Sequence, residues 1–378
     1  MYKDLYNTLE PIMWVWRFVG AYPFVIRGPI GSQQYVLSTY SIMLSLIFLI
    51  VTLQYCYKSV DFINQSATEY SLFLITISVQ QVSNVICFFD SVVLKLFFGK
   101  KITRSIENIA IQDKKLSKIG CSLNYSQAVR KGRLYIFILF IFLCFHIHSE
   151  LVYFNGGAPL LLRIFGNYLA MLQVANVILF AWLMFNVGLR FQVINCKIKT
   201  CIFDIEWADQ NSSCLLVLRT TAKAHAQLCQ AAKIINGTFV LSIINCVLSA
   251  FIFTTTMLYY IFMELKNTLP FSHAVYYCSV ILIHATTIVI IVQSCNWVHR
   301  NAHATVKVLH EFSKENNRFD DDKHLNQIIH NFSMQILHHN LTFSAWGLFP
   351  IDSTLLQSLA EAVTTYLVIL IQFDPLVT

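Results

Sequence analysis

The chain has 378 residues, of which 56% are hydrophobic and only 12% are charged, and its formal net charge is +7. A soluble globular domain is about 25% charged, so this composition excludes an ordinary soluble domain and indicates an integral membrane protein. The first 27 residues lack a compact apolar stretch followed by a cleavage site, so we expect the first span to direct membrane insertion itself. Eleven cysteines without paired spacing favour packing residues over a disulfide or metal framework. We therefore expect no metal and no cofactor.

A membrane-spanning helix needs about 20 mostly apolar residues, and seven stretches of the sequence satisfy this requirement. In chain order they are 28–57 (with its apolar part at 36–57), 71–96, 134–154, 164–189, 234–263, 267–299 and 354–373. The Asn-Gly-Gly-Ala-Pro sequence at 155–159 ends the third stretch, because Gly and Pro both oppose helical continuation. The sequence therefore predicts an all-α membrane protein with seven transmembrane helices.

The basic residues are distributed very unevenly between the two sides of these spans. Segments 1–27, 99–133, 190–236 and 300–353 contain three, nine, six and five Lys and Arg, a total of 23, whereas the opposite side has three. Lys and Arg concentrate on the cytoplasmic side of membrane proteins. This predicts a cytoplasmic N-terminus and an extracellular C-terminus. G-protein-coupled receptors have the opposite orientation, and the chain also lacks an Asp-Arg-Tyr-like triplet after its third span.

The predicted cytoplasmic segments include an amphipathic helix. Within 325–340, apolar residues recur at helical spacing: Leu325, Ile328, Ile329, Phe332 and Ile336. The fifth and sixth spans are longer than a bilayer requires, so we expect them to extend into the cytoplasm and form a helical bundle that holds subunits together. The predicted organisation is 1–299 for the first six transmembrane helices with their extensions, 300–353 for a cytoplasmic anchor, and 354–378 for the last helix and a short external tail.

The C-terminal region carries the most specific pattern in the chain. Residues 343–373 include Gly-Leu-Phe-Pro-Ile-Asp at 347–352 and end in Thr365-Tyr366, five hydrophobic residues, and Gln372-Phe373. This ending resembles the signature of insect gustatory receptors, a branch of the insect chemoreceptor superfamily. The related insect odorant receptors share the fold, so an odorant-receptor-like subunit is an alternative, but the Gln-Phe ending favours the gustatory branch.

The resemblance implies a ligand-gated, non-selective cation channel in the plasma membrane of sensory neurons. It implies a homotetramer, or a heteromer with other gustatory receptors, in contact with membrane lipid and with the seventh helix of each subunit at a central pore. A small-molecule tastant, bitter or of unassigned type, would open the channel without a G protein and without nucleic acid.

The seventh helix then has predicted pore residues. At 100° per residue, Glu361, Thr365, Val368 and Gln372 share one face. The family's constriction lies near the outer end of this helix, which here means Ile369, Gln372 and Phe373. The alternative for Gln372 is a hydrogen bond that locks a neighbouring subunit in place, and the alternative for Glu361 is a structural ion pair.

The outer ends of spans three to six carry polar and aromatic side chains suited to a small organic ligand. The candidate ligand-binding residues are His146, Glu150, Tyr153, Asn167, Tyr260, Tyr277 and His284. Glu264 shares a helical face with Tyr260, and His273 shares one with Tyr277. Each residue alone also fits a simple interfacial position, and Glu150 could instead pair with Arg163.

Two single residues and one cluster complete the candidate sites. Asp90, in the inner half of the second span, is either functional or held by a hydrogen bond to a neighbouring helix. Asn64 begins a glycosylation sequon in a predicted external loop. Histidines crowd the region 299–339, and His299 and His303 are spaced for a metal on one helical face. A membrane His-box oxidoreductase is therefore an alternative class, but no His-x-x-His-His box occurs, and we do not expect an enzyme.

Overall fold

The computed structural model describes most of the chain. The described residues are 5–18, 24–27, 34–37, 39–40, 42–43, 46–47, 49–54, 57, 71–154, 160–205, 211–266, 269–319, 323–338 and 341–372.

Nearly all of these residues are helical, which confirms the predicted all-α class. The helices are α1 (Leu5–Phe18), α3 (Ser71–Phe88), the π-helical segment η1 (Phe89–Leu94), α4 (Lys95–Lys118), α5 (Tyr125–Phe154), α6 (Leu160–Ile205), α7 (Asn211–Leu265), α8 (Phe271–Phe319), α9 (Lys323–His338) and α10 (Ser353–Gln372). The described residues between 39 and 57 are helical as well. One feature was not predicted: β1 (Phe24–Arg27) and β2 (Gln34–Leu37) form a short antiparallel pair.

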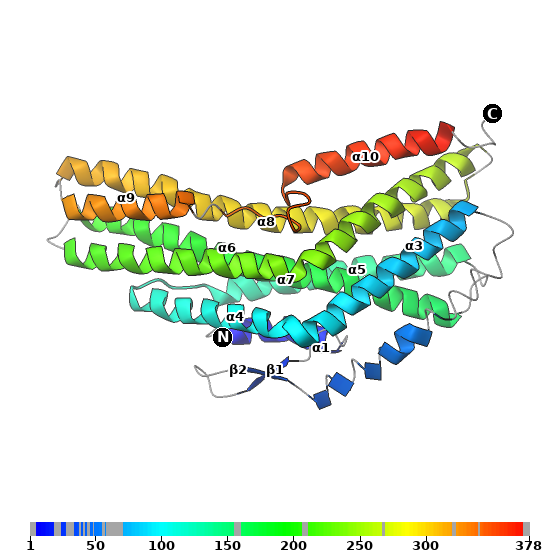
Figure 1. Cartoon of the computed structure of the whole chain (residues 1–378), viewed down its shortest axis with the longest axis horizontal. Helices are drawn as coiled ribbons and strands as arrows, with labels where there is room; N and C mark the ends of the chain where they lie inside the picture. Colours follow the sequence, from blue (N-terminus) through cyan, green and yellow to red (C-terminus); the bar gives the residue numbers. More distant parts are fainter. Residues whose placement is uncertain are drawn as a thin grey trace.

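The three longest helices run along the long axis of the molecule (Figure 1). The 55 residues of α7 extend over roughly 80 Å at about 1.5 Å per residue, whereas the hydrocarbon core of a bilayer is about 30 Å thick. Helices α7 and α8 each continue without a break and are longer than a bilayer requires, while their extension into the cytoplasm stays a prediction. The boundary predicted at residue 299 falls inside α8.

Four described helices are long and apolar enough to cross a membrane: Gly166–Cys201, Cys214–Leu265, Phe271–Lys314 and Ser353–Gln372. Shorter apolar stretches at Val82–Ser91 and Phe140–Tyr153 lie within the second and third predicted spans. Part of the first predicted span lies outside the described residues. The count of seven spans therefore stays a prediction.

Helix α6 lies at the centre of the bundle and packs against both α7 and α8. Its large side chains, such as Trp182 and Phe191, are almost completely buried. At Gly188 a Cβ atom would lie 2.4 Å from the indole of Trp297 on α8. The two helices therefore approach this closely only because residue 188 has no side chain.

The amphipathic helix predicted at 325–340 is α9, and the prediction that one of its faces is apolar and covered is confirmed. Leu325, Ile329, Phe332 and Ile336 are all buried. The surface that covers them is formed by α7 and α8 of the same chain. The buried face of α9 is thus an intramolecular contact, and a contact with another subunit would have to use other residues, such as the exposed Leu337.

A compact turn joins α9 to α10 at the inner end of α10 (Figure 1). The Ile351 N–H donates to the Phe343 carbonyl at 2.9 Å, and Ala345 is completely buried. Trp346 and Gly347 have φ values of 50° and 77°, which reverse the chain within a few residues. This turn determines where α10 begins.

Candidate functional site

Helix α10 lies on the outside of the bundle and, among the described helices, packs mainly against α7 and α8 (Figure 1). Its first turn is held by Asp352, which accepts hydrogen bonds from the backbone N–H and the hydroxyl of Thr354 at 2.8 and 2.6 Å. These bonds lower the pKa of Asp352. Further along, the ring of Tyr366 packs edge-on against Phe251 of α7, with centroids 5.2 Å apart. Tyr366 is thus a packing residue, and its hydroxyl makes no hydrogen bond with the described residues.

The face of α10 directed away from its own chain carries a polar stripe. Its exposed residues include Thr354, Gln357, Ser358, Glu361, Thr364, Thr365, Val368, Ile369 and Gln372. Gln357 donates to Glu361 at 2.8 Å, and the Thr365 hydroxyl donates to the Glu361 carbonyl at 2.9 Å. Glu361 forms no ion pair with any described residue. The chain itself leaves the predicted pore residues uncovered; Phe373 lies outside the described residues.

The C-terminal ends of α5 and α7 and the start of α8 share a hydrogen-bonded cluster, which we name the outer cluster because the sequence predicts these ends to be external. The Tyr277 hydroxyl donates to Glu264 at 2.7 Å and lies 3.2 Å from the Tyr153 hydroxyl. His273 Nδ1 lies 3.0 Å from the same Glu264 oxygen. Three helices therefore contribute four residues to one cluster around the Glu264 carboxylate. We predicted two of these residues, Tyr153 and Tyr277, to bind ligand.

Aromatic contacts extend this outer cluster. Tyr153 stacks on Tyr276 with ring centroids 4.5 Å apart, and Tyr260 lies 5.9 Å from Tyr277. A step deeper, His146 Nδ1 lies 3.1 Å from the Ser279 hydroxyl. These interactions bring together three of the helices that carry the predicted ligand-binding residues.

Other predicted members of the outer site have separate partners. Asn167 of α6 donates a hydrogen bond to Glu150 of α5, so these two residues pair with each other. The alternative pairing of Glu150 with Arg163 concerns a side chain outside the described set. His284 stacks on Phe253, with centroids 5.1 Å apart and planes 9° from parallel.

Sequence reasoning missed several members of the cluster: Ser149, Phe253, Tyr276 and Ser279. Ser149 follows His146 by three residues, so its helical spacing was a usable signal. The other three are identified only by what they contact, because Phe, Tyr and Ser are common throughout the outer halves of these spans.

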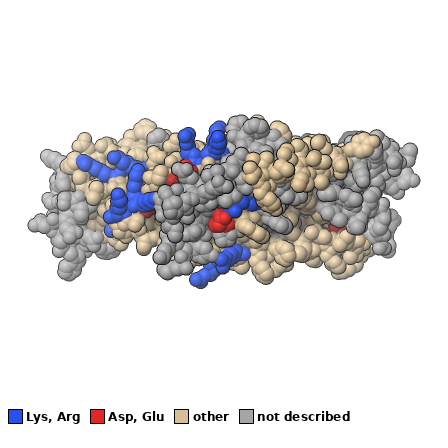
Figure 2. Space-filling view, turned by 90° about the horizontal axis from the view of Figure 1, so that it is seen from below, with Lys and Arg blue, Asp and Glu red and all other residues tan. Residues whose placement is uncertain are grey.

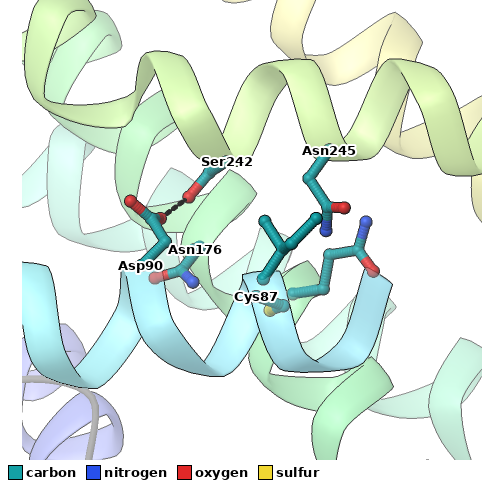
Figure 3. A pocket seen from close by; sticks show the side chains of 7 residues that line it. Cys87, Asp90, Asn176, Ser242 and Asn245 are labelled. Carbon is teal, nitrogen blue, oxygen red and sulfur yellow. Dashed lines mark hydrogen bonds between the residues drawn. The ribbon is translucent and has the colours of Figure 1, made fainter. Parts of the chain in front are cut away.

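Asp90 lies in a polar seam between η1, α6 and α7 (Figure 3). It is 2% exposed and accepts a hydrogen bond from Ser242. Asn245 of α7 pairs with Ser83 of α3 at 3.1 Å, and Asn176 of α6 donates to Ser91. The hydrogen bond to a neighbouring helix is therefore found, and the seam joins three helices at the point where the second span has π-helical geometry. The space between these side chains does not admit a water-sized molecule.

Comparison with known proteins decides which kind of molecule this is. The family model described as 7tm chemosensory receptor matches residues 9–376. The chain belongs to the 7tm chemosensory receptor family.

Relatives within this chemosensory receptor family include gustatory receptors of Drosophila melanogaster. Gustatory receptor 28b is 22% identical over 307 residues, which cover 72% of this chain and 64% of that protein. The gustatory receptor for sugar taste 43a is 26% identical over 159 residues, which cover 42% of this chain and 36% of that receptor. The aligned parts thus span less than two thirds of these relatives. The resemblance to insect gustatory receptors that the last helix predicted is confirmed.

A solved structure shows that the chemosensory receptor fold extends over the whole chain. The insect olfactory receptor OR5 from Machilis hrabei, in complex with eugenol, matches 98% of this chain and 99% of its own, with a TM-score of 0.67 and 12% identity. At this identity the match establishes the fold alone.

Membership of a receptor family also excludes the His-box oxidoreductase alternative. His299 and His303 are close, with ring centroids 4.6 Å apart, but His299 Nδ1 lies 2.7 Å from the Leu341 carbonyl. Within the described ranges, no three His, Cys, Asp or Glu side chains are placed to hold a metal. His299 of this chemosensory receptor therefore helps to connect α8 to the turn before α10. The Asn64 sequon lies outside the described residues.

Proposed function

We propose that this receptor is the subunit of a ligand-gated, non-selective cation channel of the gustatory type, with α10 lining the pore. The exposed polar stripe on α10 carries this proposal. A carboxylate and two glutamine amides on one face of a membrane helix are costly in lipid, whereas they are suited to a water-filled path. Four copies of the chain around an axis would bring four such stripes together, in a homotetramer or with other gustatory receptors.

The orientation that we propose has a cytoplasmic N-terminus and an external C-terminus in the plasma membrane of sensory neurons. The 23-to-three distribution of Lys and Arg supports it. On the face shown in Figure 2, the Lys and Arg side chains drawn in blue lie over the left and central parts of the molecule, and none is visible at the right end. Epitope tags at both termini, stained with and without permeabilisation, test this. An N-terminal tag accessible on intact cells would contradict it.

The ligand that we propose is a small organic tastant, bitter in class, bound at the outer cluster of α5, α7 and α8. The aromatic walls offer stacking contacts, and Glu264 with its tyrosine and histidine partners offers polar anchors. Because these polar groups are already bonded to one another, a ligand must replace some of these hydrogen bonds. Such replacement changes how α7 and α8 pack, and both of these helices support α10.

A pair of substitutions separates the pore from the ligand site. Gln372→Arg would place four positive charges in the proposed pore and should suppress cation current while the channel still assembles. Gln372→Ala should alter relative cation permeability. Tyr277→Phe removes one hydroxyl from the outer cluster and should instead shift the tastant dose-response without changing ion selectivity.

The measurement is whole-cell current in an otherwise unresponsive cell, with surface labelling of each variant and a panel of sugars, alkaloids and other plant compounds. A Gln372→Arg receptor that reaches the surface and conducts like wild type would contradict the pore assignment.

We also propose that Phe373 and Ile369 close the pore, so Phe373→Ala should leak current without ligand. Silence of that variant at normal surface level would count against this gate.

A further inference from the structure

We propose that a cleft between the α4–α5 turn and the inner part of α6 binds a small phosphorylated molecule and so forms a second, cytoplasmic ligand site. The cleft has a volume of about 560 Å³, within the roughly 300–1,000 Å³ that small-molecule sites occupy. The outer cluster is formed by α5, α7 and α8, whereas this cleft is formed by the turn at residues 120–125 and by α6 between Asn186 and Thr200.

The wall of the cleft is held rigidly by a buried ion pair. Arg190 donates from Nε and a terminal nitrogen to the two carboxylate oxygens of Asp113, at 3.0 and 2.8 Å. The Tyr125 hydroxyl donates to the same carboxylate at 2.9 Å, and Arg190 also donates to the Asn186 carbonyl at 2.7 Å. The end of α4, the start of α5 and the middle of α6 are therefore connected. The cleft is thus preformed, which lowers the cost of binding.

The electrostatic character of the cleft is positive. Its lining contains Arg190 and Lys197 and no Asp or Glu. Asp113 already neutralises Arg190, whereas Lys197 forms no ion pair with any described residue. Lys197 also acts on the Cys121 thiol, which lines the same cleft. Burial raises the pKa of this thiol to about 11, and the positive charge of Lys197 opposes that shift. An unneutralised cation in a preformed cleft favours an anionic ligand.

The backbone of the turn lies close to the Lys197 ammonium group. Gly120 has a φ of 80°, and a Cβ atom there would lie 3.8 Å from Lys197 Nζ. The turn thus brings its backbone close beneath the ammonium group. Around this charge, Ser122 and Asn124 add a hydroxyl and an amide group to the lining, whereas the Thr200 hydroxyl already donates to the Lys197 carbonyl at 2.9 Å. A point charge surrounded by small hydrogen-bonding groups suits a phosphate group.

The position of the cleft allows two sources for such a phosphate. Lys197 and Thr200 lie at the inner end of the candidate span Gly166–Cys201, and the orientation in "Proposed function" places this end at the cytoplasmic membrane surface. A free cytosolic phosphate ester and the headgroup of a phosphorylated lipid present the same chemistry there. Binding to purified receptor does not depend on channel activity, so this proposal fails or succeeds separately from the pore assignment.

The test uses the purified full-length receptor and two probes. Inositol 1,4,5-trisphosphate in solution is one probe, and nanodiscs containing phosphatidylinositol 4,5-bisphosphate are the other. Lys197→Gln should weaken phosphate binding by about tenfold or more, because one charge-assisted contact is lost. The matched control is Lys199→Gln, an exposed lysine two residues further along α6 that does not line the cleft. It should bind like wild type.

A second variant tests the cleft by volume instead of charge. Cys196→Trp places an indole in the lining and should abolish binding without changing net charge, while size-exclusion profiles report folding. Saturable binding of the free probe identifies a soluble ligand or detachable headgroup, and binding confined to nanodiscs identifies a lipid; both support the site. Equal losses of phosphate binding in the Lys197→Gln and Lys199→Gln variants would show that only general surface charge is involved. That result, or no binding to either probe, would overturn the proposal.

Discussion

The buried pair of Arg190 and Asp113 should contribute strongly to the stability of the region where α4, α5 and α6 meet. Replacing Arg190 with Met retains an unbranched side chain but removes the guanidinium group. Three of the hydrogen bonds described above are then lost. Asp113, whose side chain is only 7% exposed, would then keep a single described partner, the Tyr125 hydroxyl. A buried carboxylate with so little compensation is unfavourable, since its lost hydration is no longer offset.

The size of the effect follows from the geometry. Both side chains are buried, at 1% and 7% exposure, and the contact is bidentate. Breaking such a pair by removing one partner costs about 3–5 kcal/mol, whereas replacing both partners with apolar residues is often neutral or stabilising. Arg190→Met alone should therefore be severely destabilising. The double variant Arg190→Met with Asp113→Leu should recover much of the loss.

The assay is the temperature at which detergent-solubilised receptor loses its monodisperse size-exclusion peak, measured for wild type, both single variants and the double variant. The expected order is wild type and double variant close together, with both single variants well below. A single variant that melts with wild type would show that the pair is not buried as described. A double variant no better than the singles would show that the loss comes from packing and not from the unpaired charge.

Further predictions concern packing, assembly and helix capping. Gly188→Ala should destabilise the receptor by about 1–3 kcal/mol by colliding with Trp297, whereas Gly237→Ala, which meets no atom within 4 Å, should be neutral or slightly stabilising in the same melting assay. Phe332→Asp should unfold the bundle of the single chain and lower expression itself; a well-folded monomer that has lost only its oligomeric state would refute the intramolecular contact. Asp352→Ala should cost about 1 kcal/mol at the start of α10. Because the pKa of Asp352 is lowered in the folded state, its contribution is complete above the ordinary carboxyl pKa and is lost only as the pH falls into the acid range, so melting of wild type and variant should differ equally at about pH 6 and pH 8.

Composition, charge distribution and helical spacing were enough to predict the class of protein and the position of its most informative helix. Low charge and long apolar stretches require a membrane environment, and the uneven Lys and Arg content predicts an orientation. Helical spacing identified the apolar face of α9 and the polar face of α10 before any coordinates, because side-chain period depends on local backbone geometry alone. The ending from Thr365 to Phe373 was enough to indicate the family.

What covers each helix face, and which polar groups meet, depends on how the helices pack in three dimensions. Periodicity identifies that α9 has an apolar side but does not say whether its own chain or another subunit covers it. The contact of Ser242 with Asp90 joins positions 152 residues apart, and that of Arg190 with Asp113 joins positions 77 apart. Such pairs depend on the relative translation and rotation of whole helices, which many packed side chains set together and no local pattern encodes.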